Sequence, residues 1–302
     1  MTKTTATSLS APSVQEREPG PAPALSVASP RRGATRLLAN VVLIVVGVCF
    51  LLPLTWLILG SFDTHATYET SLPAQFSLEN YRAVLTPDLT FIPLWNSLLL
   101  STGAAVLTVV AALLAAYPLS RYQARFNRPF MYAVLFGTCL PITAIMVPVY
   151  SLFVQLNLLD SLPGTIFFMS ASSLPIAIWM TKNFMDSVPI SLEEAAWIDG
   201  ASAMRALRTI VVPLMRPGIA VVAIFVFLQA WGNFFVPFIL LLSPSKQPAA
   251  VSIYSFFGQY GTIAYGQLAA FSILYSVPAI VLYVVVSRGI GGSFALAGAV
   301  KG

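Results

Sequence analysis

Six long apolar runs dominate the hydrophobic pattern of this chain. Each is close to or longer than the roughly 20 residues that an α-helix needs to cross a bilayer. We therefore expect an all-α polytopic membrane protein with six transmembrane helices, at about 37–60, 93–119, 130–154, 162–180, 218–242 and 268–287. Each of the last four runs contains proline, which favours kinked helices.

Composition agrees with this pattern. Charged residues make up 9% of the chain and hydrophobic residues 57%, whereas a soluble domain carries roughly 25% charged residues. Segments that would face the cytoplasm with the N-terminus inside hold 14 of the 16 basic residues, and only Arg82 and Lys246 lie outside. Cytoplasmic loops carry an excess of Lys and Arg, so both termini are expected in the cytoplasm. The net charge of +5 then reflects orientation, and we expect no nucleic-acid partner.

The first 35 residues differ from the rest of the chain. They are rich in Ser, Thr, Ala and Pro and show no hydrophobic period, which predicts a disordered cytoplasmic tail over 1–35. No short apolar region precedes a cleavage site, so a signal peptide is not expected. The remainder, 36–302, is predicted to be one membrane domain that ends in a short tail over 288–302.

The longest polar interruption after the first third of the chain spans 189–217. It holds three of the eleven acidic residues and fits two short helices. Ser191 and Glu194 form the S-x-x-E pattern of a capping box, and Gly200 is suited to the left-handed turn that ends a helix. A second short helix is expected at about 202–209. Pro217 fits the first position of the helix that follows.

Several kinds of chemistry are missing from the sequence. Cys49 and Cys139 lie in apolar runs, His65 is the only histidine, and no spacing suggests a metal site or a cofactor. There is no phosphate-binding G-x-x-x-x-G-K-[ST] loop and no set of catalytic residues, so we expect no enzyme activity. The spans hold almost no ionisable side chains, which argues against a proton- or sodium-coupled carrier.

The polar interruption carries a recognisable pattern, E-A-A-x-x-D-G-A followed by I-x-x-P-x-x-x-P. This pattern resembles the EAA loop of binding-protein-dependent ABC importer permeases, and its D-G form is similar to the carbohydrate (maltose-type) branch. The resemblance implies the type I importer permease fold, with the loop forming a cytoplasmic coupling helix that docks on an ATPase subunit. The matching residues are Glu194, Ala195, Ala196, Asp199, Gly200, Ala201, Ile210, Pro213 and Pro217.

Other short matches extend the resemblance over about 37–302. They are L-E-N-Y at 78–81, the pair Asn96-Ser97, Tyr117 with Arg121, and a G-A-V-K-G terminus typical of the second permease of maltose-type systems. In the family that terminus reaches the ATPase subunits, which assigns this contact to Gly298, Val300 and Lys301. One departure is W-G-N-F at 231–234, where the family often has W-N-x-F. On a helix this shift would turn the Asn by about 100°.

The resemblance predicts a permease subunit in a bacterial cytoplasmic membrane. Its expected partners are a homologous second permease, two cytoplasmic ATPase subunits, an extracytoplasmic sugar-binding protein and membrane lipid. Gln229 and Asn233 are candidate contacts to the sugar, although such residues more often serve helix packing or interface anchoring. Three alternatives stay open: a same-type permease for a glycerol-phosphate-like solute, a stand-alone carrier or channel, and a membrane scaffold.

Overall fold

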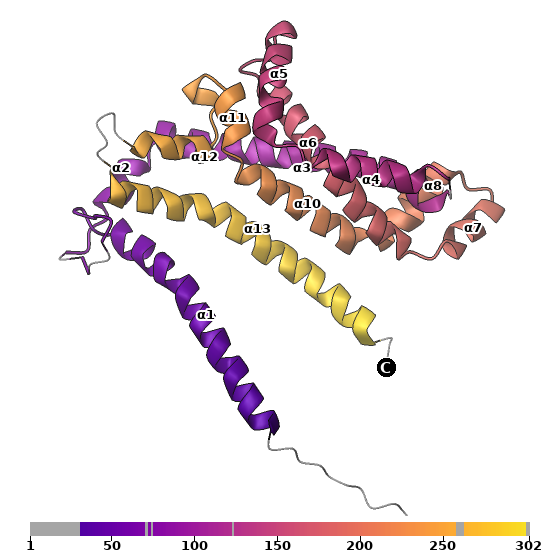
Figure 1. The fold of residues 1–302 in the computed structure, drawn as a ribbon, viewed down its shortest axis with the longest axis horizontal. Coiled ribbons are helices and arrows are strands. Elements are labelled where there is room, and N and C mark those ends of the chain that lie inside the picture. The colour runs from indigo at the N-terminus through magenta and orange to yellow at the C-terminus, as the bar shows by residue number, and fades with distance from the viewer. Residues whose placement is uncertain (1–30, 70–71, 74, 123, 258–262, 300–302) are drawn as a thin grey trace, which may run out of the picture. The chain divides into compact units, whose positions relative to one another are not determined.

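The computed structural model describes residues 31–299, apart from 70–71, 74, 123 and 258–262 (Figure 1). Within these ranges the chain is helical, and the only β-type pairing is a single bridge between Phe257 and Ile263. The four longest helices are α1 (Arg31–Ser61), α3 (Ile92–Arg121), α6 (Leu162–Asp186) and α13 (Tyr265–Ala299). Each contains a stretch that is long and apolar enough to cross a bilayer.

The chain divides into two compact units, 1–51 and 52–302. The described part of the first unit is the beginning of α1, where nearly every side chain between 36 and 51 is exposed. A helix that is apolar on all sides, and whose side chains are not buried against protein, is suited to contact lipid. All further elements lie in the second unit, where the packing that positions the functional residues is found.

The predicted third span is broken rather than kinked. It consists of α4 (Asn127–Gly137) and α5 (Ile142–Gln155), whose axes meet at 88°. Pro141 stands at the break with extended backbone angles, just before α5. A proline has no N–H for a helical hydrogen bond and disfavours helical angles in the residue before it, so α4 cannot continue through this position. Pro148, by contrast, lies inside α5.

The predicted fifth span is also interrupted. It comprises α10 (Arg216–Trp231) and α11 (Phe235–Leu240), and α10 meets the preceding segment at 80°. Asn233 therefore does not lie on a continuous helix, and the expected turn of about 100° around a helix axis is wrong. Its side-chain oxygen instead accepts a hydrogen bond from the backbone N–H of Val236, 3.1 Å away, at the start of α11.

Shorter elements connect these helices. They are α2 (Glu79–Val84), a π-helical segment (Pro87–Phe91), α7 (Ser191–Ile198), α8 (Ala203–Ala206), a second π-helical segment (Leu207–Val211), α9 (Val212–Leu214), a 3₁₀ turn (Pro244–Lys246), α12 (Ala249–Ser252) and another 3₁₀ turn (Ile253–Phe256). The L-E-N-Y match lies at the start of α2. The Asn80 amide donates to the backbone oxygens of Ser61 and Asp63, at 3.2 and 2.8 Å.

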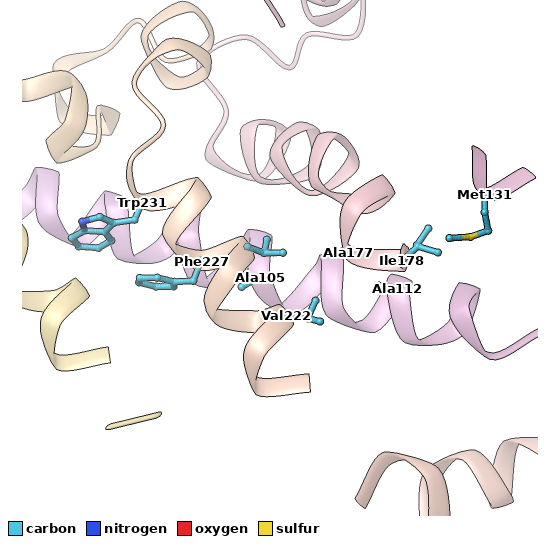
Figure 2. Packing of buried hydrophobic residues seen from close by; sticks show 9 residues of the cluster. Ala105, Ala112, Met131, Ala177, Ile178, Val222, Phe227 and Trp231 are labelled. Atoms are coloured by element: carbon cyan, nitrogen blue, oxygen red, sulfur yellow. The ribbon is translucent and has the colours of Figure 1, made fainter. Parts of the chain in front are cut away.

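Small side chains allow α3, α6 and α10 to pack closely in the centre of the second unit. Figure 2 shows Ala105 and Ala112 of α3 near Ala177 of α6 and near Val222 and Phe227 of α10. Close approach of helix backbones at small residues is a main source of helix association in membranes. The result is a three-helix core with α3 at its centre.

Polar side chains at the start of α3 hold the segment that follows α11. The Asn96 amide donates to the backbone oxygens of Ser245 and Gln247, at 2.9 and 3.1 Å, and the Ser97 hydroxyl accepts from the backbone N–H of Ala249 at 2.9 Å. Asn96 and Ser97 are both buried. The Asn96-Ser97 pair therefore fixes a loop about 150 residues further along the chain.

Asp160 holds the same loop from the other side. It follows α5 with a backbone φ of +56°, and its carboxylate accepts from the backbone N–H groups of Leu242 and Ser243, at 3.0 and 2.9 Å. The Lys246 ammonium lies 2.8 Å from one carboxylate oxygen, and the Ser243 hydroxyl lies 2.6 Å from the same oxygen. Hydrogen bonds from Lys246 and then from Ser243 hold the pKa of the Asp160 carboxyl well below its usual range.

The lowered pKa predicts how the loop responds to acid. A carboxyl whose pKa falls on folding stabilises the protein above its unfolded pKa, about 3.9 for Asp, and this contribution is lost as the pH falls toward the folded pKa. We expect the wild type to melt at a higher temperature than Asp160→Asn at pH 7, with a difference that shrinks below about pH 4. Thermal unfolding in detergent from pH 7 to pH 3 measures this. Asp88→Asn, at an exposed acid outside this loop, is the control, and identical pH profiles for the two variants would refute the prediction.

Candidate functional site

The polar interruption folds into α7, a turn, and a second helical stretch. α7 runs from Ser191 to Ile198, and the turn contains Gly200 at φ +85°, as expected for a left-handed helix end. The predicted capping box is wrong. Ser191 lies inside the helix, and the backbone oxygen of Ile190 accepts from the N–H groups of Glu193 and Glu194, at 2.9 and 3.0 Å. The helix thus begins one residue early and needs no side-chain cap.

The second stretch is longer than predicted. Ser202 caps its start, because its hydroxyl accepts from the backbone N–H of Arg205 at 3.3 Å. The helix continues through a π-helical segment into α9, which contains Pro213. A proline inside a helix removes one hydrogen bond and crowds the preceding turn, and a wider π turn accommodates both. Pro217 then lies in the first turn of α10, as predicted.

A buried ion pair fixes α7 to the end of α3. The Glu193 carboxylate accepts from Arg121 Nε at 2.6 Å and from the Tyr117 hydroxyl at 2.8 Å. The side chain of Glu193 is fully buried and that of Arg121 is 4% exposed. Arg121 also donates to the backbone oxygen of Val188, at 3.2 Å, and so holds the segment that leads into α7.

Apolar packing surrounds this ion pair. Residues from the ends of α3 and α6 and from the second stretch form one buried cluster that contains Ala116, Tyr117, Met185, Val188, Leu207, Val211 and Met215. A charge pair excluded from water in this way is stable only while both partners are present. The cluster holds the end of α3 against the second stretch, and the ion pair attaches α7 to the end of α3.

The outward face of α7 is apolar and uncovered. Ile198 is 87% exposed and Leu192 is 44% exposed, and the small Ala195 beside them is also exposed. Glu194 points away from the ion pair and is exposed as well. An apolar helix face rimmed by charge is typical of a protein-docking surface.

The residues predicted for the loop 189–217 lie together in the structure. The candidate residues for sugar binding and for the C-terminal contact lie outside this loop. Gln229 is exposed on α10 and accepts from the Ser173 hydroxyl at 3.3 Å, and Asn233 caps α11. Gly298 lies near the end of α13, whereas Val300 and Lys301 fall outside the described residues.

Sequence reasoning assigned no role to Glu193. It singled out Tyr117 and Arg121, which both donate hydrogen bonds to the Glu193 carboxylate, but it placed the functional glutamate at Glu194. The available signal was the doubled E-E before the two alanines, together with a basic residue that ends an apolar run. Helical spacing would then have turned one glutamate inward and the other outward.

The two neighbouring glutamates give a matched pair of variants. Glu193→Ala leaves the Arg121 guanidinium buried without a partner, which should cost about 3–5 kcal/mol of stability. Glu194→Ala removes an exposed side chain and should change stability by no more than about 0.5 kcal/mol. Thermal unfolding of the purified chain in detergent compares them. Adding Arg121→Leu to Glu193→Ala should restore part of the loss, and equal melting temperatures for the two single variants would contradict the buried ion pair.

Known membrane transport proteins are similar in sequence to the part of the chain that contains this arrangement. The family model described as "Binding-protein-dependent transport system inner membrane component" matches residues 104–292. The trehalose transport system permease protein SugB of Mycobacterium tuberculosis is 32% identical and covers 83% of this chain and 93% of its own length. The diacetylchitobiose uptake system permease protein NgcG of Streptomyces coelicolor is 30% identical and covers 89% of each chain.

A solved structure shares the fold. One chain of a bacterial ABC transporter involved in the import of the acidic polysaccharide alginate superposes with a TM-score of 0.74 at 22% identity, and covers 86% of this chain and 98% of that one. The family match includes the end of α3, the ion pair and the whole of 189–217. This chain therefore belongs to the family of binding-protein-dependent transport system inner membrane components.

Proposed function

We propose that this chain is the transmembrane permease subunit of an ATP-driven, binding-protein-dependent carbohydrate importer. Membership of the family supports the transport role. The sugar is suggested by the names of two relatives, which are permeases for diacetylchitobiose and for trehalose. The chain supplies the membrane path, and a partner ATPase hydrolyses the ATP.

The observation that carries this proposal is the combination of the uncovered face of α7 with its buried attachment. Leu192 and Ile198 offer apolar surface to a partner, while Glu193 on the same short helix is tied to Arg121 of α3. A force applied to α7 therefore reaches α3 through an ion pair only 2.6 Å long, and α3 lies at the centre of the three-helix core. This arrangement acts as a lever between a cytoplasmic partner and the membrane helices.

Transport follows from this lever. Closure of two ATPase subunits around ATP moves α7, the motion passes to α3, and α6 and α10 follow because they pack against it. The cavity between this chain and a homologous second permease then changes from inward-facing to outward-facing. Both termini and α7 lie in the cytoplasm in this scheme, and an external sugar-binding protein delivers its cargo to the opposite face. Gln229 is the better candidate for contact with the sugar, since its side chain is exposed, whereas Asn233 is half-buried.

Mild purification of the tagged chain tests the assembly. Mass spectrometry should identify a second permease, an ATPase and a soluble binding protein encoded with them, and the binding protein can be screened against sugars and glycerol phosphates. A preference for glycerol phosphates would replace the carbohydrate assignment. A chain that is stably expressed and purifies alone would favour a stand-alone carrier and contradict the proposal.

Two substitutions in the loop should separate ATP hydrolysis from transport. Gly200→Pro forces φ to about −65° at a position that adopts +85°, so the exit from α7 changes direction. Glu194→Lys reverses an exposed charge beside the docking face and leaves the ion pair of Glu193 intact. Both variants should insert normally but lose most sugar uptake, at least about tenfold, with ATPase activity no longer stimulated by the loaded binding protein. Uptake at wild-type rates in both would refute the coupling role of α7.

A further inference from the structure

One cavity has no role in the proposed coupling mechanism. It lies beside the end of α3. It has a volume of about 690 Å³ and is lined by the end of α3, by Tyr122, Ala124 and Arg125 after it, by the start of α4 and by the end of α6. The Asn127 amide donates to the backbone oxygens of Leu119 and Tyr122, and this contact holds the loop against both helices. The cavity is separate from the buried ion pair of Glu193.

The walls of the cavity change from charged to apolar along two helices. On α4, Arg128 is followed at helical spacing by Met131, Tyr132 and Leu135. On α6, Asp186 and Lys182 are preceded by Trp179 one turn earlier. The C-terminal end of α6 and the N-terminal end of α4 line the same end of the cavity. The charged residues of the two walls therefore lie together at that end. The cavity thus has one cationic end and one apolar, aromatic end.

The cationic end carries positive charge without a partner. Lys182 pairs with Asp186 at 2.6 Å, and the Ser120 hydroxyl occupies the other oxygen of that carboxylate at 2.6 Å. Arg125 and Arg128 are exposed and, within the part of the chain that the structure describes, form no ion pair. Two arginines that line the cavity therefore carry charge that no described acid pairs with. A guanidinium group binds phosphate oxygens in bidentate geometry.

A smaller apolar cavity lies on the opposite face of α4. It has a volume of about 450 Å³, shares Leu119 and Asn127 with the first, and is otherwise lined by Phe126, Pro129, Phe130 and Ala133. Aromatic side chains such as Tyr122, Tyr132 and Trp179 are typical of the level where lipid headgroups meet acyl chains. A phosphate-binding end, an aromatic belt and the apolar side chains of Met131 and Leu135 together match the parts of one phospholipid molecule.

We propose that this cavity binds an anionic phospholipid, with the phosphate of its headgroup between Arg125 and Arg128 and its acyl chains along Tyr132, Leu135 and Trp179. Basic pockets between transmembrane helices at the cytoplasmic face bind such headgroups. The inference depends on the chain being a membrane protein, not on its cargo. The proposed orientation serves only to name the cytoplasmic leaflet as the source of the lipid.

Native mass spectrometry of the full-length chain, with any subunits that co-purify, tests the site. Delipidated protein is titrated with phosphatidylglycerol or with phosphatidylcholine that carries the same acyl chains. We expect tighter retention of phosphatidylglycerol. Each arginine should contribute roughly fivefold to this affinity, so Arg125→Gln with Arg128→Gln should weaken it by about 25-fold. Arg125→Lys with Arg128→Lys keeps the charge and should retain most of the affinity.

Arg36→Gln is the matched control, because Arg36 is an exposed arginine that does not line the cavity. This variant should bind phosphatidylglycerol as the wild type does. An equal loss in Arg36→Gln, or equal retention of the two lipids, would overturn the proposal. Displacement of the lipid by millimolar inorganic phosphate would assign the site to a soluble anion instead. Release of an ATPase subunit from the double Gln variant with lipid retention unchanged would identify the surface as a protein contact.

Discussion

The arrangement of this protein depends on one buried charge pair, Arg121 with Glu193. Neither charge is stable without the other in a space that excludes water, so the end of α3 and the short helix α7 are obliged to stay together. Tyr117 satisfies the second oxygen of the carboxylate, and Arg121 also binds the chain that enters α7. An exposed helix of eight residues would be marginal on its own, and this attachment gives it a fixed direction.

α3 has the same organising role at its opposite end. There Asn96 and Ser97 hold the loop after α11 by hydrogen bonds. Asp160, in the segment between α5 and α6, binds the same loop. One helix thus carries polar attachments at both ends and an alanine-rich packing surface between them. Polar groups inside a membrane protein are costly, and here they occur where the chain must be held at a single position. The mechanical connection from α7 to the far loop therefore runs along one continuous helix.

Much of this architecture could be predicted from the sequence, and the failures have physical causes. Apolar length located every long helix, since the bilayer sets that length, and Gly200 and Pro217 marked real helix boundaries. The breaks near Pro141 and Asn233 were not predicted, because an apolar run looks the same whether its helix is straight, kinked or divided. Glu193 was missed because its importance lies in two contacts with residues more than 70 positions away. The S-x-x-E spacing and the E-A-A pattern both pointed to Glu194, and only tertiary packing shows that Glu193 is the buried partner of Arg121.

The contact between Gly218 and Phe184 limits how the helices can move. A methyl group at Gly218 would lie 2.6 Å from the Phe184 ring, so the ring occupies a notch that exists only because this position has no side chain. Sliding of α10 along α6 would have to lift the ring out of the notch and over the neighbouring side chains. Rotation of the two helices as one rigid body leaves the notch filled. Conformational change in this half of the molecule is thereby directed toward tilting and away from shear.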